Sequence, residues 1–344
     1  MNRVTLTSEE DASTNALLDL LTAKYSSVED PDFLREAPVY AHELPRRIRA
    51  FLNDFKLSEQ SPGICLISGY SVDDKKVGKT PQHWKDKAGR SRALAEEMLL
   101  VLYGSLLGDV FGWATEQDGH IVHDVFPIKG NEDKQISTSS EQTIWWHTED
   151  AFHAFSGDYV AMFCLRNHDQ VATTFASLDE IHLNQEHLEV LFEPRYIIRP
   201  DISHQQTNGT SAPAQAETHD ESLHQAQQRI KQMESNPEKV AVLFGHQQSP
   251  YLRIDPYFMP FLEEDEVAQQ ALKALINSID QALWAHVLQP GDCCLIDNCR
   301  TVHGRQAFKP RYDGTDRWLK RACVTRDLRK SRRARNASDS RIIF

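Results

Sequence analysis

Two residues of metal-binding type lie two positions apart in the stretch TIWWHTEDAFHAF, residues 143–155. His147 and Glu149 would point to the same face of an extended strand, because side chains alternate along a strand with a period of two. An imidazole nitrogen and a carboxylate oxygen could then bind one metal ion together. Two neighbours on one strand cannot enclose an ion, so a third ligand has to come from a distant part of the chain.

His303 is the candidate for that third ligand. It lies in LIDNCRTVHGR, after a strand-like run and directly before Gly304. Two histidines and one carboxylate on one side of a metal leave the opposite positions open, which is the arrangement that non-haem Fe(II) oxygenases use. A zinc hydrolase can also use two histidines and a glutamate, although the HExxH pattern is absent from the chain.

Two arginines follow the third candidate ligand. Arg317 lies in DRWLKRACVT, 14 residues beyond His303, and Arg321 lies four residues further on. On one strand the two share a face. A guanidinium binds a carboxylate through two parallel hydrogen bonds, which an ammonium cannot do. Two acids in one site are therefore predicted, a co-substrate and a substrate. A non-catalytic β-sandwich binding protein would explain the strands but not these arginines, whereas Arg317 could also be a surface ion-pair partner.

Composition narrows the class of protein. The chain has 344 residues, 40% of them hydrophobic, and a formal net charge of -12. This hydrophobic content suits a sizeable folded core, and the acidic balance argues against a general nucleic-acid binder. The N-terminus lacks the apolar core of a signal peptide, and no run approaches the roughly 18 apolar residues that span a bilayer. These features predict a cytoplasmic protein without a membrane or nucleic-acid partner.

The order of the elements predicts helices first and strands afterwards. Apolar residues recur at helical spacing through much of residues 1–110, so this part is predicted to be mainly helical. From residue 111 to residue 326 short β-type segments alternate with turns, which is typical of a sandwich or barrel. Ser177 and Glu180 form a possible capping box at the start of a helix in this part.

Two polar segments complete the chain. Residues 204–237 are rich in Gln, Ser, Thr and Ala, and so long a loop in a compact domain is either disordered or functional. The basic run RDLRKSRRAR, residues 326–335, leads into the tail, residues 327–344. We interpret this tail as a solvated end.

The order HTE, NCRTVHGR, Arg317 and Arg321 resembles the clavaminate synthase-like branch of the Fe(II)/2-oxoglutarate-dependent oxygenases, in particular its hydroxylases of free basic amino acids. The resemblance runs from about Trp113 to Arg326. It implies one oxygenase domain over residues 1–344, mainly β with flanking helices, around a double-stranded β-helix core of the jelly-roll, cupin-like type. It also implies that Fe(II) is bound by His147, Glu149 and His303.

The same resemblance implies roles for the residues around the metal. Arg317 would bind the C5 carboxylate of 2-oxoglutarate, supported by a threonine, Thr174 or alternatively Thr173, and O2 would be the second co-substrate. Glu149 is intact, which favours hydroxylation over halogenation. The contacts implied for the amino acid are Arg321 to its α-carboxylate, Gln117 and Glu149 to its α-ammonium, Asp201 under a lid formed by 204–237, and Asp255 to a cationic side chain.

Tyr257 is a departure from the family pattern. Arginine hydroxylases of this group tend to carry a second acid two residues after the position of Asp255, and here a tyrosine stands there. A guanidinium needs two acceptors in its plane, whereas an ammonium is a compact charge. The sequence therefore favours L-lysine as substrate, hydroxylated at C3 or C4 to hydroxylysine with succinate and CO2 as co-products. Arginine, ornithine and citrulline stay open, and the oligomeric state is not predicted. Asp201 and Asp255 could each also be ordinary turn residues.

Overall fold

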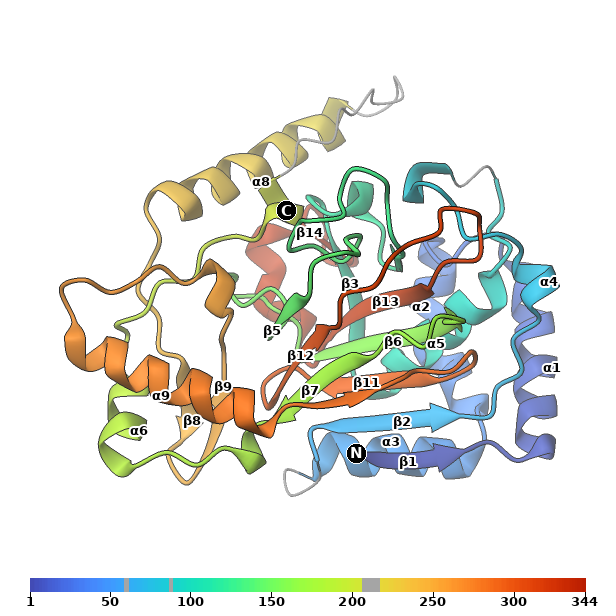
Figure 1. Ribbon diagram of the computed structural model, residues 1–344. Coiled ribbons are helices and arrows are strands. Elements are labelled where there is room, and N and C mark those ends of the chain that lie inside the picture. Colours follow the sequence, from blue (N-terminus) through green and yellow to red (C-terminus); the bar gives the residue numbers. More distant parts are fainter. Residues whose placement is uncertain (59–61, 87–88, 206–216) are drawn as a thin grey trace.

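Two β-sheets form the centre of the protein (Figure 1). The structure is a computed structural model, and it describes residues 1–58, 62–86, 89–205 and 217–344. The strands are β1 (Asn2–Thr5), β2 (Ile64–Ser68), β3 (Asp109–Trp113), β4 (His123–Val125), β5 (Ile144–His147), β6 (Tyr159–Arg166), β7 (Thr173–Ser177), β8 (Leu243–His246), β9 (Ser249–Leu252), β10 (Trp284–His286), β11 (Cys293–Asp297), β12 (Thr301–Arg305), β13 (Trp318–Thr325) and β14 (Ile342–Ile343). The larger sheet has the order β1-β2-β11-β6-β13-β3-β14, with β4 paired to β13. The smaller sheet has the order β10-β7-β12-β5, and β8 and β9 pair separately.

The two sheets face each other across an apolar layer. Phe175 of the smaller sheet packs in one buried cluster with Val160, Ile296 and Leu319 of the larger sheet. These strands are buried on both faces and are rich in branched residues, so burial of their apolar side chains stabilises the pair of sheets. This arrangement, with helices outside, confirms the predicted jelly-roll core.

Helices cover the outer faces of both sheets. The helices are α1 (Ser8–Lys24), α2 (Pro31–Tyr40), α3 (Arg46–Leu57), α4 (Asp74–Val77), α5 (Leu94–Leu107), α6 (Gln185–Leu191), α7 (Ile202–Gln205), α8 (Glu217–Ser235) and α9 (Glu266–Ala282). α5 is buried almost all round, between the larger sheet and α1, α2 and α3. On the smaller sheet, α6 and α9 pack together over β7. The cavity between the sheets is lined by residues of β5, β7, β12 and β13 together with residues of the adjoining loops.

Three local predictions differ from the structure at the helix and strand boundaries. The first strand, β1, lies inside the part predicted to be helical, where it extends the larger sheet beside β2. Ser177 and Glu180 do not form a capping box: Ser177 ends β7, and its hydroxyl donates to Asp179. α6 begins later, where the side chain of Asn184 accepts from the backbone of His187. Ser177 is thus part of the sheet through its pairing with Thr301, and Asn184, seven residues further on, is the N-cap of α6.

The polar insertion is largely helical where the structure describes it. Of residues 204–237, the stretch 206–216 lies outside the described residues, and Glu217–Ser235 form α8. Ala226 and Ile230 are buried, and Ile230 packs with Ala151 and Phe152. The interpretation as one long loop is therefore wrong for this part. Apolar residues at positions 226, 230 and 233 have the spacing of one helix face, a signal that the polar composition around them conceals.

The basic tail is folded against the domain. Leu328–Ala334 form a 3-10 helix, and β14 pairs in parallel with β3. Arg335 is 6% exposed and donates to the backbone carbonyls of neighbouring tail residues, including Ser338 and Ser340. On the other side, Arg229 of α8 donates to the carbonyl of Phe344 at 2.5 Å. The interpretation of residues 327–344 as a solvated end is therefore wrong, because several of the basic side chains hydrogen-bond the backbone.

Candidate active site

The three predicted metal ligands meet at one end of the sandwich. β12 and β5 pair so that His303 lies opposite His147, and Glu149 follows β5 in a turn. Glu149 Oε2 lies 3.1 Å from His303 Nε2 and 3.9 Å from His147 Nε2. One ligand atom from each residue lies within 4.8 Å of the others. Strand pairing therefore brings together residues that are 154 positions apart in the chain.

The surroundings of these ligands fit a metal ion. His147 Nδ1 lies 2.8 Å from the carbonyl of Trp145, so this nitrogen carries the proton and leaves the lone pair of Nε2 for a metal. Asn298 bonds both backbone groups of Glu149, at 2.7 and 3.0 Å. A Cβ at Gly304 would lie 2.6 Å from the carbonyl oxygen of Ile144, so only glycine permits this approach of β12 to β5. Two imidazoles and one carboxylate are the ligand set that suits Fe(II) with open positions.

Glu149 is held in its charged form. Burial raises its pKa, but Arg321, then His303 and His147, outweigh that effect and the pKa lies well below the usual range. A carboxylate that stays ionised is available as a ligand. Its second oxygen, Oε1, contacts Arg321 Nη1, which fixes the plane of the carboxylate beside the histidines.

Arg317 is a buried cation without an anion. It is 4% exposed and lines the cavity that the metal ligands also line. Its Nη2 donates to Thr173 Oγ1 at 3.2 Å, its Nε has no partner, and no carboxylate in the described part of the chain lies within ion-pair distance of it. Burial lowers its pKa to about 10. Because a buried charge without a counter-charge is costly, this arrangement suits a site that binds an acid.

Thr173, and not Thr174, is the threonine that contacts Arg317. Thr173 is 2% exposed, lines the cavity and contacts Arg317. Thr174 is not among the residues that line the cavity, and its hydroxyl lies beside Gly304. Neighbouring residues of a strand point to opposite faces, so only one of the pair can face Arg317. The structure selects the alternative threonine.

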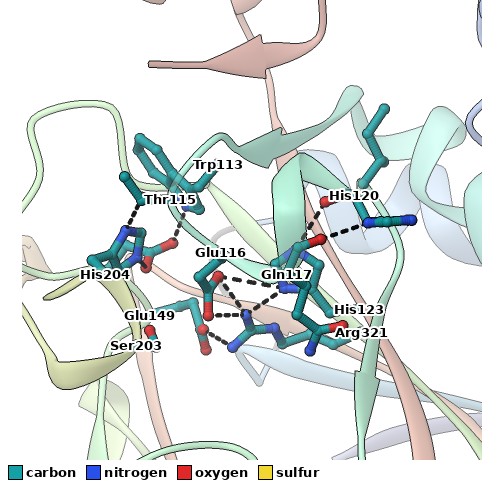
Figure 2. Close-up of polar contacts among 12 residues, drawn as sticks. Trp113, Thr115, Glu116, Gln117, His120, His123, Glu149, Ser203, His204 and Arg321 are labelled. Carbon is teal, nitrogen blue, oxygen red and sulfur yellow. Dashed lines mark hydrogen bonds and ion pairs between the residues drawn. The ribbon is translucent and has the colours of Figure 1, made fainter. Parts of the chain in front are cut away.

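Arg321 differs from the prediction because carboxylates already surround it (Figure 2). Besides Glu149, its Nη2 donates to Glu116 at 2.8 and 3.0 Å, and it also lies 2.8 Å from His123 Nδ1. Burial raises the pKa of Glu116, but Arg321 outweighs it and the pKa falls to about 2. Arg321 does line the cavity, yet its guanidinium is not free in the ligand-free protein.

Gln117 does not reach the cavity. Its amide nitrogen donates to the carbonyl of Asp124 at 2.8 Å, and its amide oxygen accepts from the Asp124 nitrogen at 3.0 Å. The neighbouring Glu116 lines the cavity in its place. The prediction that Gln117 contacts the substrate is therefore not supported by the geometry, because both polar atoms of its amide stabilise the backbone.

Asp201 and Asp255 do line the same cavity as the metal ligands. Asp201 accepts from the backbone nitrogen of Ser203 at 2.7 Å, and Asp255 accepts from that of Tyr257 at 3.2 Å. Burial raises the pKa of Asp255 to about 6, although His147 opposes the rise. Tyr257 forms part of the cavity wall and is 46% exposed. Both aspartates accept from the backbone of local turns and also line the cavity. A role in a turn is therefore compatible with the proposed contact to the substrate.

Arg305 was not predicted as a site residue. It lies two residues after His303 on β12, lines the cavity, and donates to Ser139 and to the carbonyls of Ser140 and Gln142. Burial and then the nearby Arg317 lower its pKa to about 9. The period-two rule that links His147 to Glu149 would also have placed Arg305 on the face of His303. A second cation thus adds to the positive potential around Arg317.

Comparison with known proteins identifies the family. Residues 87–323 match the taurine catabolism dioxygenase TauD, TfdA family. An L-ornithine/L-arginine 3-hydroxylase of Catenulispora acidiphila is 43% identical and is covered over 100% of both chains. An enduracididine beta-hydroxylase of Streptomyces hygroscopicus is 43% identical over 98% of both chains. The crystal structure of the non-heme iron oxygenase OrfP with Fe, succinate and (3S)-hydroxy-L-Arg superposes with a TM-score of 0.92, at 42% identity and over 100% of both chains.

The relatives weaken the preference for lysine. An L-lysine 3-hydroxylase of Catenulispora acidiphila is 28% identical, over 96% of this chain and 86% of its own length. The proteins that act on arginine or ornithine are thus more similar to this chain than that lysine hydroxylase is. Tyr257 alone carried the preference for lysine, and one residue at a partly exposed position is weak evidence against whole-chain similarity.

Among the described residues, no helix is both long enough and apolar enough to cross a membrane. The fold, the cavity and the relatives agree on the chemistry, with Fe(II), 2-oxoglutarate and O2 as the cofactor and co-substrates. The chain belongs to the TauD/TfdA family and, within its clavaminate synthase-like branch, is an Fe(II)- and 2-oxoglutarate-dependent amino-acid hydroxylase.

Proposed function

We propose that the protein hydroxylates C3 of free L-arginine, or of a close cationic relative such as L-ornithine, and forms succinate and CO2 from 2-oxoglutarate. The observation that carries this proposal is the pair of acids, Asp201 and Asp255, on the cavity that also contains the metal ligands. Two carboxylates provide acceptors for a planar guanidinium. The relatives that are named 3-hydroxylase or beta-hydroxylase support the choice of carbon.

The metal and co-substrate end is assigned to residues of the two facing sheets. His147, Glu149 and His303 hold Fe(II), and Arg317 with Thr173 holds the C5 carboxylate of 2-oxoglutarate. When bound, iron with 2-oxoglutarate and O2 supplies the oxidant for an unactivated C–H bond. The chain selects the carbon by position, because a substrate held rigidly presents one C–H bond to the metal.

The amino-acid head group is assigned to the acid and base pairs around Arg321. In the ligand-free protein this guanidinium neutralises Glu116 and Glu149. A zwitterion can enter here without leaving a charge unpaired, since its carboxylate replaces Glu116 at Arg321 while its ammonium compensates Glu116. We therefore assign the α-ammonium to Glu116 and Glu149 in place of Gln117.

The side chain of the amino acid is assigned to Asp255 and Asp201. An arginine guanidinium offers five donors in one plane, which can bond both acids and the hydroxyl of Tyr257. L-Lysine is the second candidate, because Tyr257 stands where a second acid is expected and an ammonium needs fewer acceptors. For L-arginine, Tyr257 would provide an additional acceptor for the guanidinium, whereas for L-lysine it would stand where no second acid is needed.

Succinate formation by the purified Fe(II) enzyme with 2-oxoglutarate tests the proposal. L-Arginine, L-ornithine, L-lysine and L-citrulline are compared, and NMR locates the hydroxyl group. We expect arginine to exceed lysine by about tenfold in kcat/KM, the value of one charged hydrogen bond, with hydroxylation at C3. Lysine as the best substrate would establish the second candidate, and citrulline as the best would remove the role of Asp255.

A matched pair of variants sharpens the substrate assignment. Asp255→Asn removes the charge and keeps the shape, so it should lower kcat/KM for cationic substrates by about 10- to 100-fold. Tyr257→Asp supplies the second acid and should raise arginine relative to lysine by about tenfold. An unchanged ratio in Tyr257→Asp would show that position 257 does not discriminate between them.

A further inference from the structure

A second cluster of buried polar groups lies next to the metal ligands. Glu116, Asp150 and His204 each place one polar atom within 4.8 Å of the others, and all three are buried. His204 Nε2 lies 3.0 Å from Asp150 Oδ1, and its Nδ1 lies 2.7 Å from the hydroxyl of Thr115 (Figure 2). Both ring nitrogens are therefore already bonded within the protein. The histidine connects two segments and is not arranged as a metal ligand.

One side of this connection is the turn that carries Glu149. Asp150 follows Glu149 directly, and its other oxygen, Oδ2, accepts from Trp113 Nε1 at 2.6 Å. Asp150 is therefore fixed against the end of β3. Because Asp150 and Glu149 are adjacent, any displacement of one backbone moves the other.

The other side of the connection is the short helix α7. His204 lies in α7, whose preceding residue Asp201 bonds the backbone and hydroxyl of Ser203. Asp201 and Ser203 line the cavity, whereas His204 is not among the residues that line it. The side chain of His204 is completely buried, with its ring 5.6 Å from that of Trp113 and 5.0 Å from that of Phe152.

The buried histidine has a specific geometric consequence. Asp201 accepts from the backbone of Ser203, the next residue His204 bonds Asp150, and Asp150 directly follows Glu149. Hydrogen bonds at both ring nitrogens fix the orientation of His204 more narrowly than apolar packing would. α7 thus has one position relative to the metal ligands, and the carboxylate of Asp201 has one place over the cavity.

We propose that His204 is a positioning residue for substrate binding, which fixes α7 to the turn of Glu149 so that Asp201 meets the cationic end of the amino acid. The proposal rests on the function proposed above and adds a residue that touches neither substrate nor metal. Thr173 lies on β7 and Arg317 directly before β13, and in the described part of the chain no hydrogen bond or ion pair joins either side chain to α7, so the binding of 2-oxoglutarate should not depend on His204.

His204→Ala is the first test, with binding measured anaerobically so that no turnover occurs. Calorimetric titration of L-arginine into the Fe(II) and 2-oxoglutarate complex should show affinity about tenfold or more weaker than in the parent protein. The weak visible band of the Fe(II) and 2-oxoglutarate complex should saturate within about twofold of the parent concentration. Equal weakening of both ligands would show a general structural defect and overturn the proposal.

Conservative and control variants separate positioning from packing. His204→Gln can retain a donor to Asp150, and it should recover part of the affinity that His204→Ala loses. His153 is the matched control, because it is buried with its ring 4.5 Å from that of Trp113, whereas no hydrogen bond to α7 is found for it among the described residues. His153→Gln should leave arginine affinity within about twofold of the parent. A loss in His153→Gln equal to that in His204→Ala would contradict the inference.

A double-mutant cycle tests the route through Asp201. If His204 acts by placing Asp201, the double variant His204→Ala and Asp201→Ala should bind arginine within about twofold of Asp201→Ala alone. Losses that simply add would overturn the proposal. Should His204→Ala fail to fold, Thr115→Val breaks the second ring contact and enters the same cycle.

Failure of the role proposed for His204 can be distinguished from failure of the proposed function. If no cationic amino acid stimulates succinate formation in the parent protein, the proposed function fails. If arginine binds the parent and the cycle is additive, only the role of His204 fails.

Discussion

Arg317 lies directly before β13 and Arg321 lies four residues further on, within that strand. Both are buried and line one cavity, yet their electrostatic surroundings are opposite. Arg321 bonds two carboxylates, and despite burial these raise its pKa well above its usual value. Arg317 bonds one hydroxyl, and burial lowers its pKa to about 10. One cation is neutralised by the fold and the other is not.

The difference separates two uses of the same side chain. A buried ion pair with good geometry contributes little net stability, but removal of one partner is costly because the other charge is left buried. A buried cation with no partner costs stability throughout, and binding of an anion offsets that cost. Arg321 is therefore paired within the fold, whereas we expect Arg317 to complete its pairing on binding of 2-oxoglutarate.

The largest effect is expected for 2-oxoglutarate binding by Arg317→Met. Loss of the partner of a desolvated carboxylate costs about 2–5 kcal/mol, so we expect about 10³-fold weaker binding, measured anaerobically by the visible band of the Fe(II) complex. Arg317→Lys keeps the charge but loses the two-pronged geometry, and it should lose less. Normal binding in Arg317→Met would remove the distinction between the two arginines.

Stability without ligands should give the reverse order. Arg321→Met leaves Glu116 and Glu149 without their counter-charge, and it should lower the free energy of unfolding by about 3–5 kcal/mol. Arg317→Met removes an unpaired charge and should change that free energy by less than about 1 kcal/mol, or raise it. Urea denaturation of the metal-free protein measures both.

A second change provides the control for Arg321. Adding Glu116→Gln to Arg321→Met removes one of the orphaned charges, so it should restore part of the lost stability. Equal losses in Arg317→Met and Arg321→Met would mean that the two pairings do not differ energetically in solution.

Substitution of the neighbouring threonines should have a smaller effect on 2-oxoglutarate binding, and the effect should differ between the two positions. Thr173→Val removes the hydroxyl that accepts from Arg317, and it should raise the KM for 2-oxoglutarate by about tenfold. Thr174→Val has the same size change one position along β7 and should leave that KM unchanged. The opposite outcome would restore Thr174 as the supporting residue.

The smallest effect concerns pH and the substrate cation. Because burial raises the pKa of Asp255 to about 6, its carboxylate is charged above that pH and becomes protonated below it. Affinity for a cation is therefore present above pH 6 and lost below, so the KM for arginine should rise about fourfold between pH 7 and 5.5. Asp255→Asn has no charge to lose, and this part of the pH profile should disappear in the variant.

The metal ligands and Arg317 could be predicted from sequence because each rests on short-range geometry. The alternation of side chains along a strand indicated a shared side for His147 with Glu149 and for Arg317 with Arg321. All four line the cavity, although Glu149 lies in the turn after β5 and Arg317 directly before β13. The jelly-roll core followed from the many short apolar strands and from the resemblance to a known branch.

The errors arise where a side chain had an equally good partner that the sequence does not reveal. Gln117 bonds the backbone of Asp124, and its neighbour Glu116 takes the cavity. Glu116 and His204 carry no local pattern, since their side-chain hydrogen bonds join segments 54 to 205 residues apart. Polar composition hid α8 and basic composition hid the packed tail, because neither segment shows by composition which face is covered.

The packed tail has a practical meaning for work with this enzyme. Residues 340–344 connect the polar insertion and the basic tail. β14 pairs with β3, and Arg229 of α8 donates to the carbonyl of Phe344. α8 rests in turn on Phe152, close to the metal turn. A truncation that removes β14 would also remove the contact of Arg229 with Phe344, and we expect it to loosen the packing of α8 on Phe152, three residues after Glu149.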